Sequence, residues 1–294
     1  MDWLDHPILQ RFTEHLRRTG ASPHTVRAYG RWMREFVQFL GPLGCPLEQT
    51  LQDEHERNFA ARDFRQYLRH ARRLAPASVN QALAALHTFY QSLGLSAPRV
   101  RREELPQLAP RALSAEEQRR FLRAVERCPS ARNRAIAYLL YYCGLRVAEC
   151  VGLDTADVLL TDRRGRLIVR HGKGGRQREV PLHPVARRSL SAWLQERQAN
   201  FGESLDPLFV NTRGQRLTTR SVDLLMDRLG EEAGVEVSAH VLRHTFATNL
   251  IRKGHDLVLV AELAGHARLD TVRRYSLPTV EDLEAAIETL PQDR

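Results

Sequence analysis

The stretch His240-Val241-Leu242-Arg243-His244-Thr245-Phe246-Ala247-Thr248 decides how the second half of this 294-residue chain is interpreted. Apolar residues recur at helical spacing through Ile251, which predicts a helix. His240 and Arg243 stand one turn apart on this helix and face the same way, so both can bind one phosphate. His240 and His244 also have the spacing of a metal-binding pair, but no Glu follows His240 and no third ligand is apparent. The pattern therefore predicts a phosphate-binding pair and no metal.

Two further patterns follow this helix. Gly265-His266 and Tyr275 are separated by nine residues, in a stretch that begins with Leu263-Ala264 and ends with Arg273-Arg274-Tyr275. A single tyrosine behind two arginines is usually a surface or interface residue. By itself, this stretch indicates no chemistry.

An arginine and a glutamate lie upstream, in Gly144-Leu145-Arg146-Val147-Ala148-Glu149. Arg146 follows a glycine at a predicted helix start, and Glu149 lies three residues on, on the same helix face. An ordinary ion pair within the helix is the alternative to a functional role.

Lys173 is one of only two lysines in the chain, the other being Lys253, so 42 of the 44 basic residues are arginine. It lies in a Gly-rich turn, His171-Gly172-Lys173-Gly174-Gly175, that is suited to the tip of a β-hairpin. A lysine there offers a titratable ammonium group, which arginine cannot supply. The alternative is an exposed turn residue without a role.

Together these residues supply what the cleavage of a DNA phosphodiester requires. The displacement of a 5′ oxygen needs a nucleophile, donors to the phosphoryl oxygens and an acid for the leaving alkoxide. The set contains a tyrosine, two arginines, two histidines and a lysine, and it needs neither a metal nor another cofactor.

The ordered set Arg146, Lys173, His240-x-x-Arg243, Gly265-His266 and Tyr275 resembles the active-site signature of the tyrosine recombinases, the family of the phage integrases and Xer recombinases. The resemblance covers the whole second domain, and the helical first domain resembles the SAM-like core-binding domain of the family. The size of the chain is typical of compact, Xer-like members with two domains.

This resemblance implies a role for each residue. Tyr275 is expected to attack the scissile phosphate and form a 3′-phosphotyrosyl link, and Lys173 to protonate the leaving 5′ oxygen. The other roles are phosphate binding by Arg146 and Arg243, proton transfer at the nucleophile by His240, a hydrogen bond to the phosphate from His266, and support of this set by Glu149. The family further implies duplex DNA as partner, strand exchange through a Holliday junction, and a tetramer on two duplexes.

The remaining sequence predicts a mainly α-helical chain with one small antiparallel β-sheet in its second domain. Four helices are expected in the first domain, over about 8–18, 23–40, 59–74 and 76–93. Short strands are expected at 158–160, 167–169 and 178–182, and a capping box at Ser114-Ala115-Glu116-Glu117 opens a helix. The expected domains are residues 1–97 and 111–294, joined by a Pro-rich, charged linker at 98–110.

Composition agrees with a globular protein that binds a polyanion. The chain is 43% hydrophobic and 27% charged, and its net charge of +9 favours nucleic acid as partner. Its four cysteines have no CxxC spacing, and it has no signal-peptide pattern or long apolar run, so we expect a cytoplasmic protein with reduced thiols and no membrane contact.

Several points stay open at this stage. A type IB topoisomerase uses the same phosphotyrosyl chemistry, and a noncatalytic DNA-binding protein can share the fold. Residues 280–290 form an apolar helical pattern that either binds a neighbouring protomer or packs within its own chain. Ser276-Leu277-Pro278 differs from the Thr-His that often follows the nucleophile in Xer proteins, which weakens an assignment to chromosome-dimer resolution and leaves room for a mobile-element integrase or resolvase. The sequence reveals neither the DNA site nor whether a second recombinase shares the tetramer.

Overall fold

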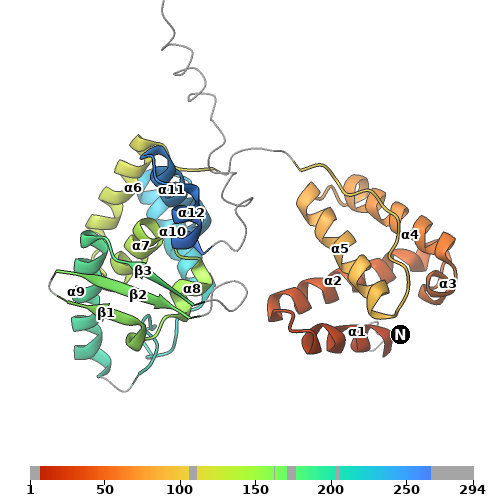
Figure 1. Ribbon diagram of the computed structural model, residues 1–294, viewed down its shortest axis with the longest axis horizontal. Helices are drawn as coiled ribbons and strands as arrows, with labels where there is room; N and C mark the ends of the chain where they lie inside the picture. Colours follow the sequence, from red (N-terminus) through yellow and green to blue (C-terminus); the bar gives the residue numbers. More distant parts are fainter. Residues whose placement is uncertain (1–6, 106–110, 162, 171–176, 203–204, 266–294) are drawn as a thin grey trace, which may run out of the picture. The chain divides into compact units, whose positions relative to one another are not determined.

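The computed structural model describes residues 7–105, 111–161, 163–170, 177–202 and 205–265. The chain divides into two compact units, Met1–Pro106 and Gln107–Arg294 (Figure 1). Within the described ranges, none of the helices combines the length and the apolar character that crossing a membrane requires.

The N-terminal unit is helical throughout its described part. Its helices are α1 (Pro7–Arg18), α2 (Pro23–Leu40), α3 (Leu47–Gln52), α4 (Glu54–Gln66) and α5 (Pro76–Ser92). As predicted, α2 and α5 begin with a proline, and the Ser22 side chain caps α2 by accepting a hydrogen bond from the Thr25 N–H. The four predicted helices are therefore present, and the short α3 is an addition to them.

The third predicted helix begins and ends earlier than expected from 59–74. It begins at Glu54, where Asp53 caps it by accepting from the His55 N–H, and a π-helical turn at Tyr67–Ala71 follows its end. The prediction missed its first turn because Glu54-His55-Glu56-Arg57 carries no apolar residue.

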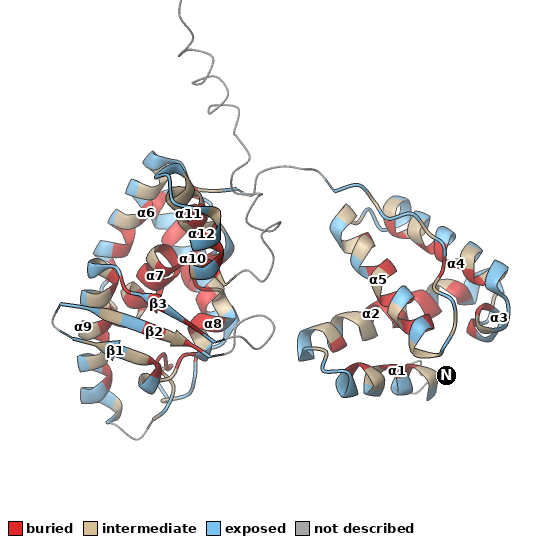
Figure 2. Cartoon of the chain, viewed as in Figure 1, coloured by how far each residue is buried: buried red, intermediate tan, exposed pale blue. Residues whose placement is uncertain are grey.

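Aromatic side chains fill the centre of the N-terminal unit, where buried residues from all four long helices meet (Figure 2). The Phe12 and Phe89 rings meet edge to face with centroids 5.4 Å apart, and the Phe36 and Phe64 rings do so at 5.1 Å. These contacts join α1 to α5 and α2 to α4, so the unit has a core of its own.

The segment after α5 stays against the N-terminal unit as far as the structure describes it. The buried Arg57 donates to the Ser96 carbonyl at 3.0 Å, and Asn80 exchanges two hydrogen bonds with the backbone of Glu103. The Glu103 carboxylate also pairs with Arg65 at 2.6 Å. Residues 98–105 of the expected linker therefore contact helices of this unit, and residues 106–110 lie outside the described residues.

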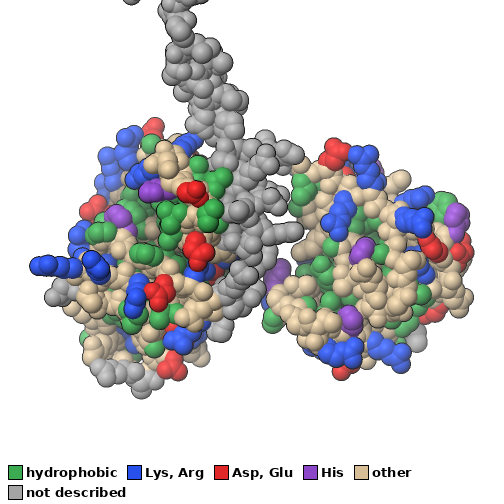
Figure 3. Space-filling view, viewed as in Figure 1, with side chains coloured by type: hydrophobic (Ala, Val, Ile, Leu, Met, Phe, Trp, Pro, Cys, Tyr) green, Lys and Arg blue, Asp and Glu red, His purple; other side chains and the backbone are tan. Residues whose placement is uncertain are grey.

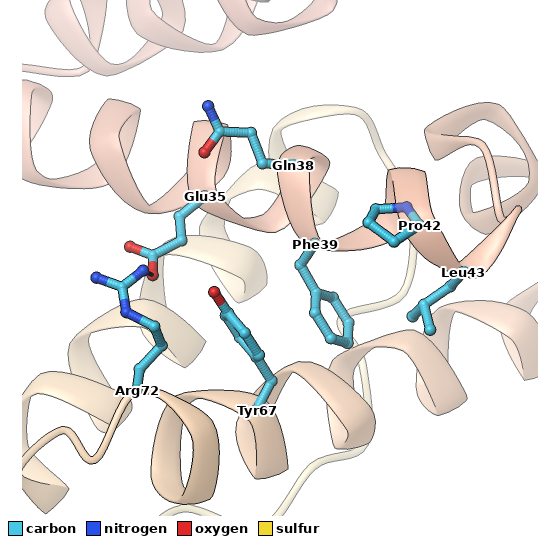
Figure 4. Close-up of a pocket in the computed structure, with 7 residues that line it drawn as sticks. All are labelled: Glu35, Gln38, Phe39, Pro42, Leu43, Tyr67 and Arg72. Carbon is cyan, nitrogen blue, oxygen red and sulfur yellow. Dashed lines mark hydrogen bonds and ion pairs between the residues drawn. The ribbon is translucent and has the colours of Figure 1, made fainter.

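A surface pocket of about 310 Å³ lies between α2 and the turn after α4 (Figure 4). Phe39 and Tyr67 form its aromatic wall, and Glu35 pairs with Arg72 at 2.5 Å at one end. No residue of the predicted catalytic set lines it. The pocket is therefore not a candidate for the strand-cleavage site.

The C-terminal unit combines helices with a small antiparallel sheet, as predicted. Its described helices are α6 (Ala115–Arg127), α7 (Ala131–Cys143), α8 (Val147–Gly152), α9 (Pro184–Phe201), α10 (Thr219–Ala233), α11 (Ala239–Arg252) and α12 (Leu257–Ala264). Its described strands, in the order β1-β2-β3, are β1 (Val158–Leu160), β2 (Gly165–Val169) and β3 (Arg178–Pro181). The predicted capping box is formed, since Ser114 and Glu117 each bind the other's backbone N–H.

The sheet presents one face to the core of this unit. Leu167 pairs with Val180 in the register of β2 and β3, and both are buried together with Val169. Helix α7 is buried along almost its whole length and packs against α9 and α11 (Figure 2). It ends at Cys143 with Gly144 as its C-cap, shortly before the residues that form the candidate site.

Candidate active site

Glu149 lies at the centre of a cluster of three arginines that come from distant parts of the C-terminal unit. Arg146 precedes α8, Arg178 begins β3, and Arg243 lies on α11. The Glu149 carboxylate accepts from Arg146 Nη1 at 2.7 Å, and Arg178 binds both of its oxygens through Nη1 and Nη2, at 2.9 and 2.8 Å. Arg243 Nη1 lies 4.0 Å from the same carboxylate. The fold thus brings Arg146 and Arg243 of the predicted set together around the buried carboxylate of Glu149, which belongs to the same set.

The start of α8 explains why Glu149 is placed there. Arg146 has an extended backbone and precedes the first helical turn, and its N–H donates to Glu149 Oε2 at 2.9 Å. This bond satisfies one of the free donors at a helix start. The ion pair between Arg146 and Glu149, which the sequence offered as the alternative to a functional role, is therefore present, but it is one part of a larger cluster.

Burial and charge act in opposite directions on Glu149, whose side chain is 2% exposed. Burial by itself raises the pKa of this carboxyl group, but the hydrogen bonds and charge of Arg178, followed by those of Arg146, lower the pKa to about 2. Glu149 is therefore ionised at neutral pH. Three guanidinium groups and one carboxylate leave the cluster with a net charge of +2.

All three arginines also bind main-chain carbonyls at the end of α12, and Arg178 does so through Nε, which donates to the Leu263 carbonyl at 3.2 Å. Arg146 Nη2 donates to the Gly265 carbonyl at 2.9 Å, and Arg243 donates to the carbonyls of Ala264 and Gly144. Gly265 ends α12 in the left-handed conformation, with φ of 65°. The cluster therefore fixes the chain at the residue before His266.

Arg146 is the most exposed of the three arginines. Its side chain is 27% exposed, whereas the side chains of Arg178 and Arg243 are 6% and 4% exposed. Figure 3 shows Arg and Lys side chains spread over both units with acidic side chains among them. Surface charge alone therefore does not single out the site, and the cluster around Glu149 does.

Gly144 brings α7 close to α11 beside this cluster. Its φ of 59° is left-handed, and a Cβ atom there would overlap the Phe246 ring. Only glycine lets the chain pass this close to Phe246 while its carbonyl accepts from Arg243 Nη1 at 2.5 Å. The glycine before Arg146 thus has a packing reason that its position in the motif did not reveal.

His240 lies at the start of α11, next to His244. The two Nε2 atoms are 2.6 Å apart, so one ring donates and the other accepts. Partial burial, followed by the charges of Arg243 and Arg146, lowers the pKa of His240 below its usual 6.5. His240 is therefore neutral at neutral pH and can accept a proton.

Three predicted residues lie outside the described residues, namely Lys173, His266 and Tyr275. The predicted helix at 280–290 also lies outside them. What the structure describes is their attachment: β2 ends at Val169 and β3 begins at Arg178 on either side of Lys173, and α12 ends at Ala264, two residues before His266.

Arg178 is the cluster member that the sequence did not reveal. One signal was available, because Arg178 alternates with Val180 on the strand and so points to the core face. An arginine at an inward position of a strand needs a buried partner. With 42 arginines in the chain, this one was hidden among the others.

Known proteins resemble this chain in both units. The phage integrase family matches residues 111–281, and the phage integrase N-terminal SAM-like domain matches residues 8–94. The chain belongs to the phage integrase family. It is a tyrosine recombinase of the Xer-like, two-domain kind, which confirms the family predicted from its motifs.

Named relatives support this membership over nearly the whole chain. Tyrosine recombinase XerA of Thermococcus kodakarensis is 34% identical over 288 residues, covering 96% of this chain and 94% of that protein. Tyrosine recombinase XerC of Myxococcus xanthus is 34% identical over 317 residues, covering 96% and 97%. A crystal structure of the XerH recombinase bound to palindromic difH substrate, a post-cleavage complex, is similar with a TM-score of 0.75 and 25% identity, covering 92% of this chain and 80% of that one.

Proposed function

We propose that this tyrosine recombinase cuts and rejoins duplex DNA at a specific site, with Tyr275 as its nucleophile. The observation that carries the proposal is the cluster in which Glu149 joins Arg146 and Arg243 beside the chain that leads to His266. A net positive cluster with one partly exposed guanidinium is suited to a phosphodiester.

Arg146 and Arg243 bind the nonbridging oxygens of the scissile phosphate. Negative charge builds up on these oxygens when Tyr275 attacks, and guanidinium donors that are already fixed by Glu149, Gly144 and Gly265 need little reorganisation. Glu149 is the orienting group of this set.

Three other residues complete the chemistry. His240, held neutral by its surroundings, takes the proton of the Tyr275 hydroxyl as the phenolic oxygen bonds to phosphorus. Lys173 gives a proton to the 5′ oxygen as its bond to phosphorus breaks, and His266 donates a hydrogen bond to the phosphate. The hairpin between β2 and β3 carries Lys173 to the site.

The 3′-phosphotyrosyl bond conserves the energy of the phosphodiester, so a 5′ hydroxyl of a second duplex reverses the attack. Strand exchange then proceeds through a Holliday junction without a metal or a nucleotide. We infer a tetramer on two duplexes, with the helix at 280–290 binding a neighbour, and residues 1–97 and 111–294 joined at 98–110 acting together on the DNA. The described cysteines are free thiols, in keeping with action in the cytoplasm.

A nicked duplex that carries the recombination site tests this proposal, because loss of the short 5′ product traps the covalent complex. Tyr275→Phe should abolish the complex. Tyr142→Phe is the control and should retain it, because it keeps the ring that stacks on His183, with ring centroids 4.1 Å apart. Trapping by Tyr275→Phe to the wild-type extent would contradict the choice of nucleophile. Relaxation of any supercoiled plasmid without exchange between two sites would favour a topoisomerase instead.

A further inference from the structure

Arg178 binds the catalytic cluster from its buried side. Its guanidinium binds both oxygens of Glu149, at 2.9 and 2.8 Å, and its Nε donates to the Leu263 carbonyl at 3.2 Å. All three guanidinium nitrogens of Arg178, whose side chain is 6% exposed, thus have partners within the protein. It therefore acts on the reaction through other residues.

The charges of the cluster show what Arg178 contributes. Without it, Glu149 would be shared by Arg146 and Arg243 alone, and one of their two positive charges would be cancelled before any phosphate arrived. A bidentate partner on the buried side balances the carboxylate instead. The charge of Arg146 and Arg243 is then left for the phosphate.

We propose that Arg178 is a positioning residue for strand cleavage, balancing Glu149 so that Arg146 and Arg243 keep their full charge for the scissile phosphate. This inference rests on the proposed function of the same site. It adds a residue from β3, the strand that follows Lys173 in the sequence.

The contact between Arg178 and the end of α12 supports this role. A Cβ atom at Gly265 would lie 2.7 Å from Arg178 Nη1, and Gly265 has a left-handed φ of 65°. The guanidinium thus packs directly on the glycine before His266, while its Nε holds Leu263. One side chain fixes the positions of Glu149 and of the chain that leads to His266.

Charge balance in the cluster predicts that a second substitution partly reverses the effect of the first. Arg178→Met removes the balancing charge but keeps most of the side-chain volume, so Glu149 cancels part of the charge of Arg146 and Arg243. Loss of a residue that orients catalytic ligands in metal sites costs about 10- to 100-fold, and we expect a decrease of that size in the cleavage rate. Adding Glu149→Gln removes the unbalanced carboxylate, so the double variant should cleave faster than Arg178→Met alone.

The experiment measures single-turnover formation of the covalent complex on the nicked duplex by the full-length chain, with DNA affinity measured separately. Arg178→Met should reduce the cleavage rate constant while Kd stays within about threefold, because Arg178 does not touch DNA. Arg178→Lys keeps the charge without the two-point contact and should fall between wild type and Arg178→Met.

Arg197 provides the matched control, since it is also buried in the same unit but donates to the carbonyls of Pro207 and Leu205 instead of to a carboxylate. Arg197→Met should lower the Tm as Arg178→Met does, and should keep the cleavage rate constant within about twofold. The Tm of each variant fixes an assay temperature at which all of them are folded.

Recovery of cleavage in the Arg178→Met/Glu149→Gln variant relative to Arg178→Met supports the proposal. Wild-type cleavage by Arg178→Met, or a double variant as slow as or slower than Arg178→Met, overturns it while leaving the proposed function intact. Absence of covalent DNA with the unaltered chain would overturn the proposed function, and this inference with it.

Discussion

Glu149→Gln is the substitution whose effect on stability follows most directly from the structure. The ionised carboxylate is buried among Arg146, Arg178 and Arg243, and the contacts with Arg178 and Arg146 outweigh the effect of burial and lower its pKa from 4.5 to about 2. At about 1.4 kcal/mol for each pKa unit, this lowering corresponds to about 3 kcal/mol of unfolding free energy. Removal of one partner from a buried ion pair costs about 3–5 kcal/mol in other proteins, which is the same range.

The sign of the pH dependence follows from the direction of the shift. Because the folded state lowers the pKa of Glu149, its contribution is complete above the unfolded value of about 4.5 and is lost as the pH falls through about 2. The difference in unfolding free energy between wild type and Glu149→Gln should therefore be about 3 kcal/mol at pH 7 and shrink below pH 4.5. Other carboxylates titrate equally in both proteins and cancel in this difference.

Tryptophan fluorescence isolates the unit that carries the cluster. The chain has three tryptophans, and replacing Trp3 and Trp32 by phenylalanine leaves Trp193, which is buried in the C-terminal unit and donates to the Leu208 carbonyl. Urea unfolding of this variant with a single tryptophan, with and without Glu149→Gln, gives the difference in unfolding free energy at each pH.

Glu179→Gln is the matched control on β3. Its partner Arg166 is 56% exposed and Glu179 itself 51% exposed, and such surface pairs contribute about 0–1 kcal/mol. A loss below about 1 kcal/mol for Glu149→Gln at pH 7, or a loss that is unchanged at pH 3, would refute the ionised, charge-balanced state of Glu149 described above.

Three further outcomes follow. Gly144→Ala places a Cβ against the Phe246 ring at a left-handed φ, so it should destabilise the C-terminal unit by about 1–3 kcal/mol. Adding Phe246→Leu to this variant should restore part of the lost Tm. A Tm unchanged by Gly144→Ala would contradict the close packing. Because burial and the charges of Arg243 and Arg146 lower the pKa of His240, the cleavage rate should hold below pH 6.5 and fall only at more acidic pH. A pH–rate profile that already falls above pH 6.5 would contradict a His240 with a lowered pKa as the general base. Covalent-complex formation in EDTA should equal that in Mg²⁺, since guanidinium groups supply the charge, and loss of the complex in EDTA would reveal a metal requirement.

Local signals in the sequence were sufficient for most of the fold. Pro23 after Ser22, and Ser114 with Glu117, mark helix starts through interactions within one turn, and the structure shows these interactions. The strand positions also agreed, because a short run of β-branched and other apolar residues such as 167–169 is typical of a strand, and Leu167 and Val169 are buried in the core. Such elements are encoded within a few residues, so a single sequence reveals them.

Elements without an apolar period were harder to predict. Helix α3 has six residues after Pro46, which is too short for helical periodicity to be recognised, and the polar first turn of α4 starts at an Asp53 cap rather than at an apolar residue. Both depend on packing and capping rather than on a repeating pattern.

For the site, the motif was sufficient to select Arg146, Glu149 and Arg243, which the fold brings together. The motif did not include Arg178, because its meaning depends on contacts with Glu149, 29 positions away in the sequence, and with Leu263, 85 positions away. The roles of all the predicted site residues stay predictions from the family signature, and Lys173, His266 and Tyr275 also lie outside the described ranges.

Mass spectrometry of the trapped covalent complex tests the nucleophile most directly. Trypsin cuts after Arg274, and no lysine or arginine follows until Arg294, so Tyr275 is the first residue and the only tyrosine of its peptide. After nuclease treatment, peptide 275–294 should carry a nucleotide joined through its 3′ phosphate to the Tyr275 oxygen. A nucleotide on any other peptide, or on a serine or threonine of this one, would contradict the assignment.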